Sequence, residues 1–440
     1  MLENNNRIEI ESISLSDLFK KKLVIPAYQR PYVWTNFEID KLLNQIKEHE
    51  KRKIVKGEKP NFYLGGIVLH KSGEDYNVID GQQRITTMQI LHLIKKGISY
   101  NTGYSHPISI KQIQVNYEVF KQKSFYIINF DKINVTIITT QSEDMAYNFF
   151  ETLNTGGKRL SGTDILKAHH LRSVADNYER NAKALEWEKK HKNLEKVNRI
   201  LSKIRRMNYF KNDFVPDKFT NDDKWKNLLT EDFADKVEKG NRDVGYSFVE
   251  IEENTHKITA GKYAIRQPLN EGLNYINYLL NFTNDYNYLF EFDISRTDKY
   301  SQFTNKIINV IDGTADLRHF YQIVLLCYVD RFGKKNILEF CLYLFKFIYS
   351  LRLSVQSRVY EATVRNFIND KKIIERILYA FTYEEILGYL KDYEYSVTIE
   401  ELSGVKKRFY DRVNTFFNCT NFDESYNQQL TNAIDKYLNN

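Results

Sequence analysis

The scarcity of proline in the second half of the chain is the feature that most constrains its fold. Beyond residue 172 only Pro216 and Pro268 occur, although the chain has 440 residues. Apolar residues in this half recur at helical spacing, in long runs rich in Leu, Ile, Tyr and Lys. Because proline interrupts helix interiors, its near absence predicts an all-helical domain over residues 173–440.

The first 172 residues have a different pattern, in which short apolar or alternating segments are separated by turn residues. Such segments predict strands, and the expected ones are Arg7–Glu11, Leu23–Ile25, Tyr63–His70, Tyr76–Ile79, Ile108–Asn116, Phe125–Phe130 and Ile133–Thr139. The sequence from Thr35 to Glu38 has the form of a capping box and predicts a helix that runs to about Glu48. Mixed strands and helices predict an α+β domain over residues 1–172.

A short motif, Asp80-Gly81-Gln82-Gln83-Arg84, joins one of these strands to a helix. Gly81 permits backbone angles that a side chain would penalise, and the first N–H groups of the helix then offer a site for an anion. Arg84 adds donors suited to phosphate, and Asp80 adds a carboxylate suited to a metal ion or a ribose hydroxyl. From these residues alone, a nucleotide-phosphate site and a solvated, capped turn are equally good interpretations.

A second motif near the N-terminus comprises residues Ile25–Trp34. We expect it to be extended, because Ile25 and Arg30 each precede a proline. It displays Tyr28, Gln29 and Arg30, whose ring, amide and guanidinium suit a base pocket or a modified DNA strand. For the large aromatics Tyr32 and Trp34, packing against the core is the favoured interpretation.

A third motif contains Asn154, Gly156 and Gly157, which interrupt helical periodicity and predict a loop. Backbone N–H groups in such loops can wrap an anion, and Lys158 and Arg159 would supply charge. A plain helix–helix connection with a solvated basic tip explains the same residues equally well. Asp164 fits either a helix start or a site carboxylate.

These motifs, together with Phe62-Tyr63-Leu64-Gly65-Gly66-Ile67-Val68-Leu69, occur in an order that resembles the N-terminal domain of GmrSD-type restriction endonucleases, also known as domain of unknown function 262. The resemblance covers roughly residues 8–172. It implies a ParB/sulfiredoxin-like mixed α/β fold, and hydrolysis of nucleoside triphosphates with a divalent metal such as Mg²⁺. Many relatives act against phage DNA with modified bases or backbones. Many also have arginine where this chain has Gly156, so a phosphate contact there would fall to Lys158 and Arg159.

The resemblance also implies roles for individual residues. The expected catalytic residues are Asp80, Gln82, Gln83 and Arg84, with Asp80 as the metal ligand and a glutamine orienting the attacking water. The expected nucleotide-binding residues are Tyr28, Gln29, Arg30, Gly81, Asn154 and Lys158.

A basic stretch runs from Trp187 to Lys211, with apolar residues interleaved at helical spacing. A solvated helix face is the usual meaning of such a run, and contact with a phosphate backbone is the alternative. The residues expected to contact DNA are Lys189, Lys190, Arg199, Arg205 and Arg206.

Composition adds modest limits. The net charge of +7 permits DNA binding without requiring it. The three cysteines are odd in number and lack paired spacing, which argues against a disulfide framework or a zinc site. No apolar run is long enough to span a bilayer and the start lacks the form of a signal peptide, so a cytoplasmic location is expected.

The leading prediction is a metal-dependent nucleoside triphosphatase that senses DNA in an antiphage, restriction-type defence system. Many relatives carry a C-terminal His-Asn-His nuclease domain, which needs histidine, whereas the last histidine here is His319. DNA cleavage is therefore expected from a separate nuclease subunit. Two alternatives stay open: a non-catalytic module that binds nucleotide or DNA, and a phosphodiesterase activity in the α/β domain itself.

Overall fold

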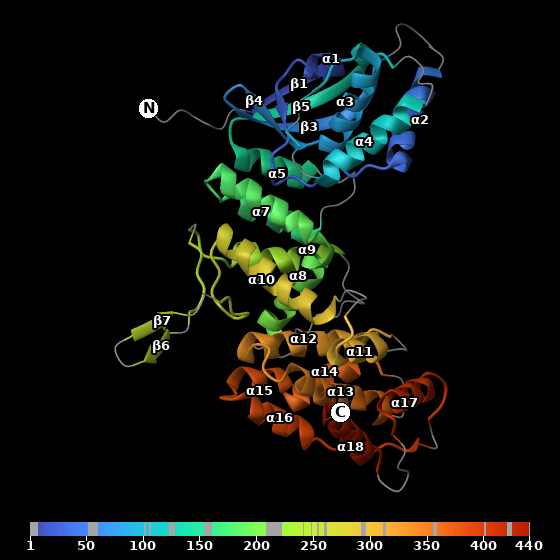
Figure 1. Cartoon of the computed structure of the whole chain (residues 1–440). Helices are drawn as coiled ribbons and strands as arrows, with labels where there is room; N and C mark the ends of the chain where they lie inside the picture. The colour runs from blue at the N-terminus through green and yellow to red at the C-terminus, as the bar shows by residue number, and fades with distance from the viewer. Residues whose placement is uncertain are drawn as a thin grey trace. The chain divides into compact units, whose positions relative to one another are not determined.

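The computed structural model describes most of the chain, in two compact units that comprise Met1–Lys189 and Lys190–Asn440 (Figure 1). The residues described are 8–51, 60–100, 103–104, 107–122, 128–153, 161–207, 222–240, 242–247, 249–252, 255–258, 262–291, 296–310, 314–354, 359–399, 402–419 and 425–439. The sequence-predicted boundary at residue 172 coincides with the end of a helix, and one further helix belongs to the first unit.

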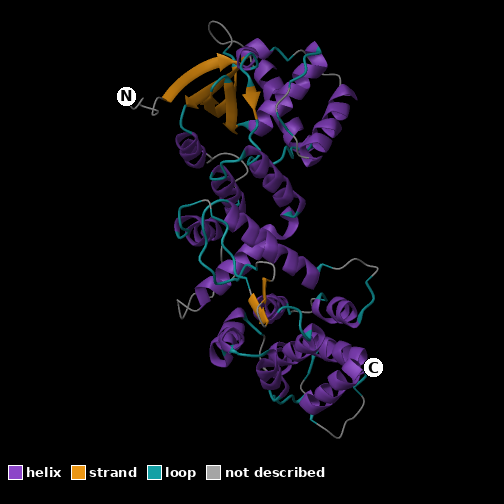
Figure 2. Ribbon diagram, turned by 60° about the vertical axis from the view of Figure 1, so that its left-hand side comes forward, coloured by secondary structure: helices purple, strands orange, loops and turns teal. Residues whose placement is uncertain are grey.

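The first unit is built on a five-stranded sheet with the order β1-β5-β3-β4-β2. Figure 2 shows strands of this sheet in orange beside purple helices. Its strands are β1 (Ile8–Ser14), β2 (Leu23–Val24), β3 (Phe62–Ser72), β4 (Asp75–Asp80) and β5 (Ile133–Thr140). The neighbouring pairs β3–β5 and β4–β2 are parallel, whereas β1–β5 and β3–β4 are antiparallel. This mixed sheet with its helices confirms the predicted α+β class.

The first unit also contains helices of between four and 16 residues. They are α1 (Leu15–Leu18), α2 (Asn36–Lys51), α3 (Gln82–Lys96), α4 (Pro107–Gln122), α5 (Glu143–Leu153), α6 (Gly162–Arg172) and α7 (Asn177–Lys189). The helix predicted from Thr35 is α2, and the Glu38 carboxylate accepts the Thr35 backbone N–H at 2.8 Å, as a capping box requires. Apolar side chains of α2 and α3 pack with those of β3, β4 and β5 in one buried cluster.

Two predicted strands are wrong. Ile108–Asn116 lies within α4, where Ile108, Ile110 and Val115 are exposed and the polar Ser109 and Asn116 are buried. Their β-branched character favoured a strand, but the buried polar side chains make hydrogen bonds that need helical spacing. Within Phe125–Phe130, the described residues 128 and 129 form a loop, and a 3₁₀ turn follows at Phe130–Lys132.

The second unit is almost entirely helical, as predicted. Its helices are α8 (His191–Met207), α9 (Asp222–Thr230), α10 (Leu273–Phe290), α11 (Lys299–Phe303), α12 (Ala315–Phe332), α13 (Ile337–Ser354), α14 (Glu361–Lys371), α15 (Ile373–Tyr379), α16 (Tyr383–Lys391), α17 (Gly404–Phe417) and α18 (Tyr426–Asn439), and π-helical turns occur at Glu231–Asp235 and Thr304–Ile308. The second unit also contains a small antiparallel hairpin of β6 (Val249–Glu252) and β7 (Thr255–Ile258). None of the helices described is both long enough and apolar enough to cross a membrane.

Candidate functional site

The Asp80–Arg84 motif lies where β4 ends and α3 begins. Gly81 is the N-cap of α3 and has a φ of +95°, a conformation that favours glycine. The position also has little room for a side chain, since a Cβ atom there would lie 3.0 Å from Ile67 Cγ1. The turn therefore has the strand, glycine and helix start that the sequence predicted, and the first backbone N–H groups of α3 lack acceptors within the helix.

Arg84 is held by the backbone of the adjacent strand. Its Nη1 donates to the Leu64 carbonyl at 3.1 Å, and its Nη2 donates to the Gly66 carbonyl at 2.8 Å. The same Nη2 lies 3.5 Å from Asp80 Oδ2. The Arg84 and Asp80 side chains remain 25% and 27% exposed, so a cation and an anion stand together at a helix N-terminus, open to solvent.

Gly65 explains why the glycine pair of β3 accompanies the Asp80–Arg84 turn. It has a φ of +122°, and a Cβ atom there would lie only 2.0 Å from Arg84 Nη1. The register between β3 and β5 also shifts between Tyr63 and Gly65. Gly65 thus opens the space that the guanidinium occupies, and the two motifs form one structural feature.

The two glutamines of the turn bind the extended N-terminal segment. Gln83 Oε1 accepts the backbone N–H groups of Val33 at 3.0 Å and Trp34 at 3.3 Å, and its Nε2 donates to the Pro31 carbonyl at 2.9 Å. Gln82 Nε2 donates to the Arg30 carbonyl at 3.1 Å. Gln82 Oε1, in contrast, is buried and has no hydrogen-bond partner. Both the oxygen and the nitrogen of the Gln83 amide are engaged by the backbone of this segment, so Gln83 acts as a positioning residue in this structure.

Tyr32 anchors the same segment from the other side. Its hydroxyl lies 2.8 Å from Thr87 Oγ1 on α3 and accepts a hydrogen bond from Asn116 Nδ2 on α4 at 3.0 Å. Ser109 Oγ accepts the Tyr32 backbone N–H at 3.0 Å. Burial raises the pKa of Tyr32 to about 12. Tyr32 is buried and Trp34 packs against the same core, as their size favoured.

Tyr28 and Gln29 hydrogen-bond to neighbouring elements of the first unit, and the Gln29 and Arg30 side chains are partly exposed. Tyr28 is buried, and its hydroxyl donates to the Glu143 carboxylate on α5. Burial, and then the Glu143 charge, raise the pKa of Tyr28. Gln29 Nε2 donates to the Ile79 carbonyl of β4 at 3.0 Å. The segment is thus attached to the strand that ends at the candidate site.

A buried ion pair supports this segment and was missed from the sequence. Lys167 on α6 pairs with Glu188 on α7, and its Nζ also donates to the Gln29 carbonyl at 3.3 Å. Beside this pair is a cavity of about 30 Å³ lined by Gln29 and Arg30 among others, which is room for roughly one water molecule. The sequence did hint at this ion pair, because helical spacing places Lys167 on the apolar face of its helix.

Part of the third motif can be placed. Asp164 caps α6, since it accepts the Ser161 backbone N–H at 3.1 Å while the Ser161 hydroxyl accepts the Asp164 N–H. Its helix-start role is confirmed. Asn154 and Lys158 lie outside the described residues.

The basic stretch is divided between two helices. Lys189 is exposed at the end of α7 in the first unit, whereas Lys190 begins the second unit and precedes α8. The apolar face expected along it is present on α8, where Leu194, Val197, Ile200, Leu201 and Ile204 are all buried.

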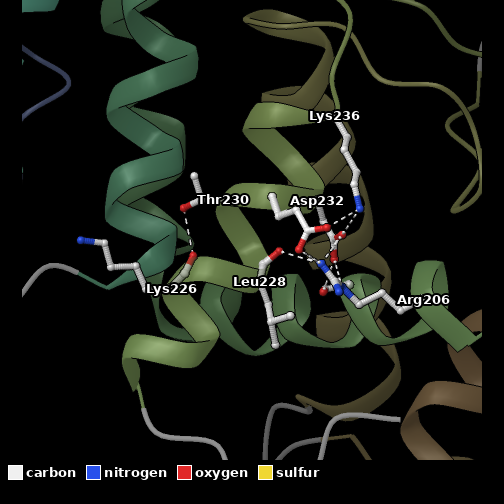
Figure 3. Close-up of polar contacts among 8 residues, drawn as sticks. Arg206, Lys226, Leu228, Thr230, Asp232 and Lys236 are labelled. Atoms are coloured by element: carbon white, nitrogen blue, oxygen red, sulfur yellow. Dashed lines mark hydrogen bonds and ion pairs between the residues drawn. The ribbon is translucent and has the colours of Figure 1, made fainter. Parts of the chain in front are cut away.

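Arg206 does not face solvent, contrary to a role in phosphate contact. Its guanidinium is buried against the Asp232 carboxylate, with Nε–Oδ2 at 2.6 Å and Nη2–Oδ1 at 2.8 Å (Figure 3). Its Nη2 also donates to Glu231 Oε2 at 2.8 Å. Burial alone would lower the Arg206 pKa, but these hydrogen bonds raise it. Hydrogen bonds from Lys236 and Arg206 lower the pKa of Glu231 to about 2.

The other two arginines of α8 also have internal partners. Arg205 Nη1 donates to the carbonyls of Gln267 at 3.0 Å and Ile265 at 3.3 Å. Arg199 pairs with Glu195 and lies over the Trp225 ring, 5.2 Å from its centroid. The helix uses its arginines to bind neighbouring parts of its own unit. Among the five predicted DNA contacts, Lys189 is exposed to solvent.

No three His, Cys, Asp or Glu side chains within the described ranges are grouped so that they could hold a metal ion by themselves. A magnesium ion that is shared with nucleotide phosphates needs only one or two carboxylates from the protein. The single carboxylate of Asp80, beside Arg84 and partly exposed, fits that requirement.

Comparison with known families places both parts of the chain. Residues 179–405 match a family of unknown function, DUF7834, over more than half of the chain. The chain belongs to this family. Residues 15–171 match the GmrSD restriction endonuclease N-terminal domain, which confirms the resemblance that the motifs indicated. No curated protein matches the chain. The GmrSD domain indicates a component of a restriction-type defence system, and its match contains the whole Asp80–Arg84 site.

Proposed function

We propose that the first unit binds and hydrolyses a nucleoside triphosphate at the turn between β4 and α3, as the DNA-sensing component of a restriction-type defence system. One observation carries the proposal: Asp80 and Arg84 stand together, partly exposed, at the N-terminus of α3, while Gln82 and Gln83 between them are buried. A cation, a carboxylate and free helix amides are what recognition of a phosphate and its metal requires.

In this proposal Arg84 and the first amides of α3 hold the phosphates. A guanidinium has five N–H donors, and the two bonds to Leu64 and Gly66 leave others for a ligand. Those two bonds also fix the guanidinium before any ligand arrives. Preorganised donors stabilise charge that develops in the transition state without having to reorganise.

Asp80 is the residue that would hold the metal. When bound, Mg²⁺ would neutralise phosphate charge during transfer. Asp80 itself would fix the position of the nucleotide relative to Arg84, because the two side chains are 3.5 Å apart.

Gln82 is the glutamine that we assign to the attacking water. Its Oε1 is buried without a hydrogen bond, whereas both amide atoms of Gln83 are occupied. A neutral amide can orient water without titrating. Tyr28, Gln29 and Arg30 then act by fixing the loop that holds Gln82, through the Arg30 carbonyl.

DNA cleavage is assigned to a separate nuclease subunit. A His-Asn-His nuclease needs histidine as base and metal ligand, and residues 320–440 contain no histidine.

Nucleotide turnover with Mg²⁺ tests the proposal, with and without DNA. Asp80→Asn is expected to reduce turnover about 100-fold or more, as loss of a transition-state contact commonly does. Asp75→Asn is the matched control, because Asp75 begins the same strand and pairs with Lys22 at 2.7 Å, away from the turn. Equal turnover by wild type, Asp80→Asn and Arg84→Ala, each verified as folded, would refute the assignment.

Binding without hydrolysis is the second candidate. It is favoured by the extent to which Gln83 and Arg84 are already used to hold the fold. Calorimetry that finds tight nucleotide binding to wild type, weakened by Arg84→Ala, with no phosphate release in any condition, would select this candidate.

A further inference from the structure

The second unit contains a basic pocket outside the site already described. It has a volume of about 470 Å³. It lies between the turn that joins α12 to α13 and the junction of α15 with α16, helices labelled in Figure 1. The lining residues that bear on its ligand are Lys262, Arg331, Lys335, Phe381 and Glu384.

The charge of the pocket is predominantly positive. Lys262, Arg331 and Lys335 line it, and Glu384 is the one acid among the lining residues. Arg331 is held in place because its Nη2 donates to the Ala380 carbonyl at 3.1 Å. Lys262 is likewise held by the Asp330 carbonyl. Two of the three cations are therefore positioned in advance, which suits an anionic ligand.

The junction of α15 with α16 adds exposed aromatic rings. Phe381 is 89% exposed and Tyr379 is 74% exposed, two residues apart in the chain. A phenylalanine that is almost fully solvated gives no packing energy to the fold. Its backbone is nevertheless fixed, because the Phe381 and Thr382 N–H groups donate to the Glu385 carboxylate in the cap of α16. The ring is thus presented to solvent from an ordered turn.

We propose that this pocket binds a single strand of nucleic acid, with phosphates on Lys335, Arg331 and Lys262 and an unstacked base on the Phe381 ring. Basic grooves beside aromatic platforms are the general means of holding single strands without regard to sequence. Duplex bases are stacked inside the helix and cannot reach such a ring. The inference rests on the DNA-sensing part of the proposed function and places that sensing in the second unit.

Fluorescence anisotropy of the full chain with a labelled single strand of about 20 nucleotides tests the pocket. Phe381→Ala is expected to weaken binding about five- to 100-fold, the range for loss of one stacking contact. Lys335→Gln is expected to weaken binding and to reduce the salt dependence by about one phosphate contact. Phe37→Ala and Lys239→Gln, at exposed positions elsewhere, are expected to bind as wild type. Comparing DNA and RNA strands of the same sequence shows which of the two nucleic acids the pocket binds more tightly.

Three results would overturn the proposal. The first is that Phe381→Ala and Lys335→Gln both bind the single strand as tightly as wild type does. The second is that a duplex binds wild type as tightly as the single strand does, and binds Phe381→Ala equally well. The third is that wild type binds no strand at low salt, which would leave the pocket for an acidic polypeptide. Nucleotide turnover by the wild-type chain alone is measured separately. If the chain binds the single strand through Phe381 but does not hydrolyse the nucleotide, only the triphosphatase assignment is refuted. If it hydrolyses the nucleotide but does not bind the single strand through Phe381, only the pocket proposal is refuted.

Discussion

Replacement of Gly65 by alanine is predicted to disrupt the candidate site through a side chain that never touches a ligand. The new Cβ atom would lie 2.0 Å from Arg84 Nη1, so the guanidinium must leave the carbonyls of Leu64 and Gly66. The φ of +122° adds backbone strain of about 1–3 kcal/mol. With the lost charged hydrogen bonds, the free energy of unfolding of the first unit should fall by about 3–6 kcal/mol.

Gly73→Ala provides the matched control. Gly73 also has a positive φ, +62°, but nothing lies within 4 Å of its added Cβ atom. Its substitution should therefore show only conformational strain of about 1–2 kcal/mol. Urea unfolding measures the loss, and hydrogen exchange in peptides of β3 and α3 assigns it to the first unit.

A double-mutant cycle with Arg84→Ala isolates the steric part. When the guanidinium is absent, Gly65→Ala should cost only the backbone strain of about 1–3 kcal/mol. The difference between the two backgrounds is the coupling energy of Gly65 with Arg84. Additive effects, or equal losses for Gly65→Ala and Gly73→Ala, would refute the reasoning.

Three further predictions concern buried polar groups. Gln83→Leu should lower the free energy of unfolding by about 2–4 kcal/mol, because buried backbone groups of the 31–34 segment lose their partner; an unchanged urea midpoint would contradict this. Lys167→Met should lower the free energy of unfolding by about 3–5 kcal/mol in thermal unfolding, because Glu188 is left buried and charged. The double variant Lys167→Met with Glu188→Gln should recover most of this loss, and no recovery would contradict the prediction. Burial raises the pKa of Asp330 to about 6, so this carboxyl holds its proton more tightly when folded, and its stabilising contribution is complete below about pH 4 and lost as pH rises through 6. Asp330→Asn should therefore stabilise the chain by about 3 kcal/mol at pH 8 and much less at pH 4, and an equal effect at both pH values would contradict the assignment.

Much of the fold follows from patterns that the sequence displays directly. The strands around His70, Tyr76 and Val135 alternate or run apolar between turn residues, and they form the sheet as predicted. The error at Ile108–Asn116 came from giving β-branched residues more weight than Pro107, whose place at the first turn of a helix is a common start signal. Tertiary hydrogen bonds made by Ser109 and Asn116 fix the helix, and single-residue propensities do not contain them.

The turn was located from the sequence, but the contacts that its side chains make were not. Asp80 and Arg84 lie partly exposed at the predicted turn. The partners of Gln83 are backbone atoms about 50 residues away, and nothing in local sequence reports such a contact. The internal role of Arg206 was hidden for a similar reason, because its partners Glu231 and Asp232 are on a separate helical turn.

The Arg84 guanidinium occupies the space that a side chain at position 65 would need, and this limits how related sequences can diverge. Mutations at the two positions must occur in a fixed order: arginine has to be replaced before the glycine can accept a side chain, since the reverse order passes through an unstable intermediate. Related chains should therefore include members that keep Gly65 without Arg84, but none that keep Arg84 without Gly65. Such an asymmetric pattern would distinguish steric dependence from shared ancestry, which preserves both residues together.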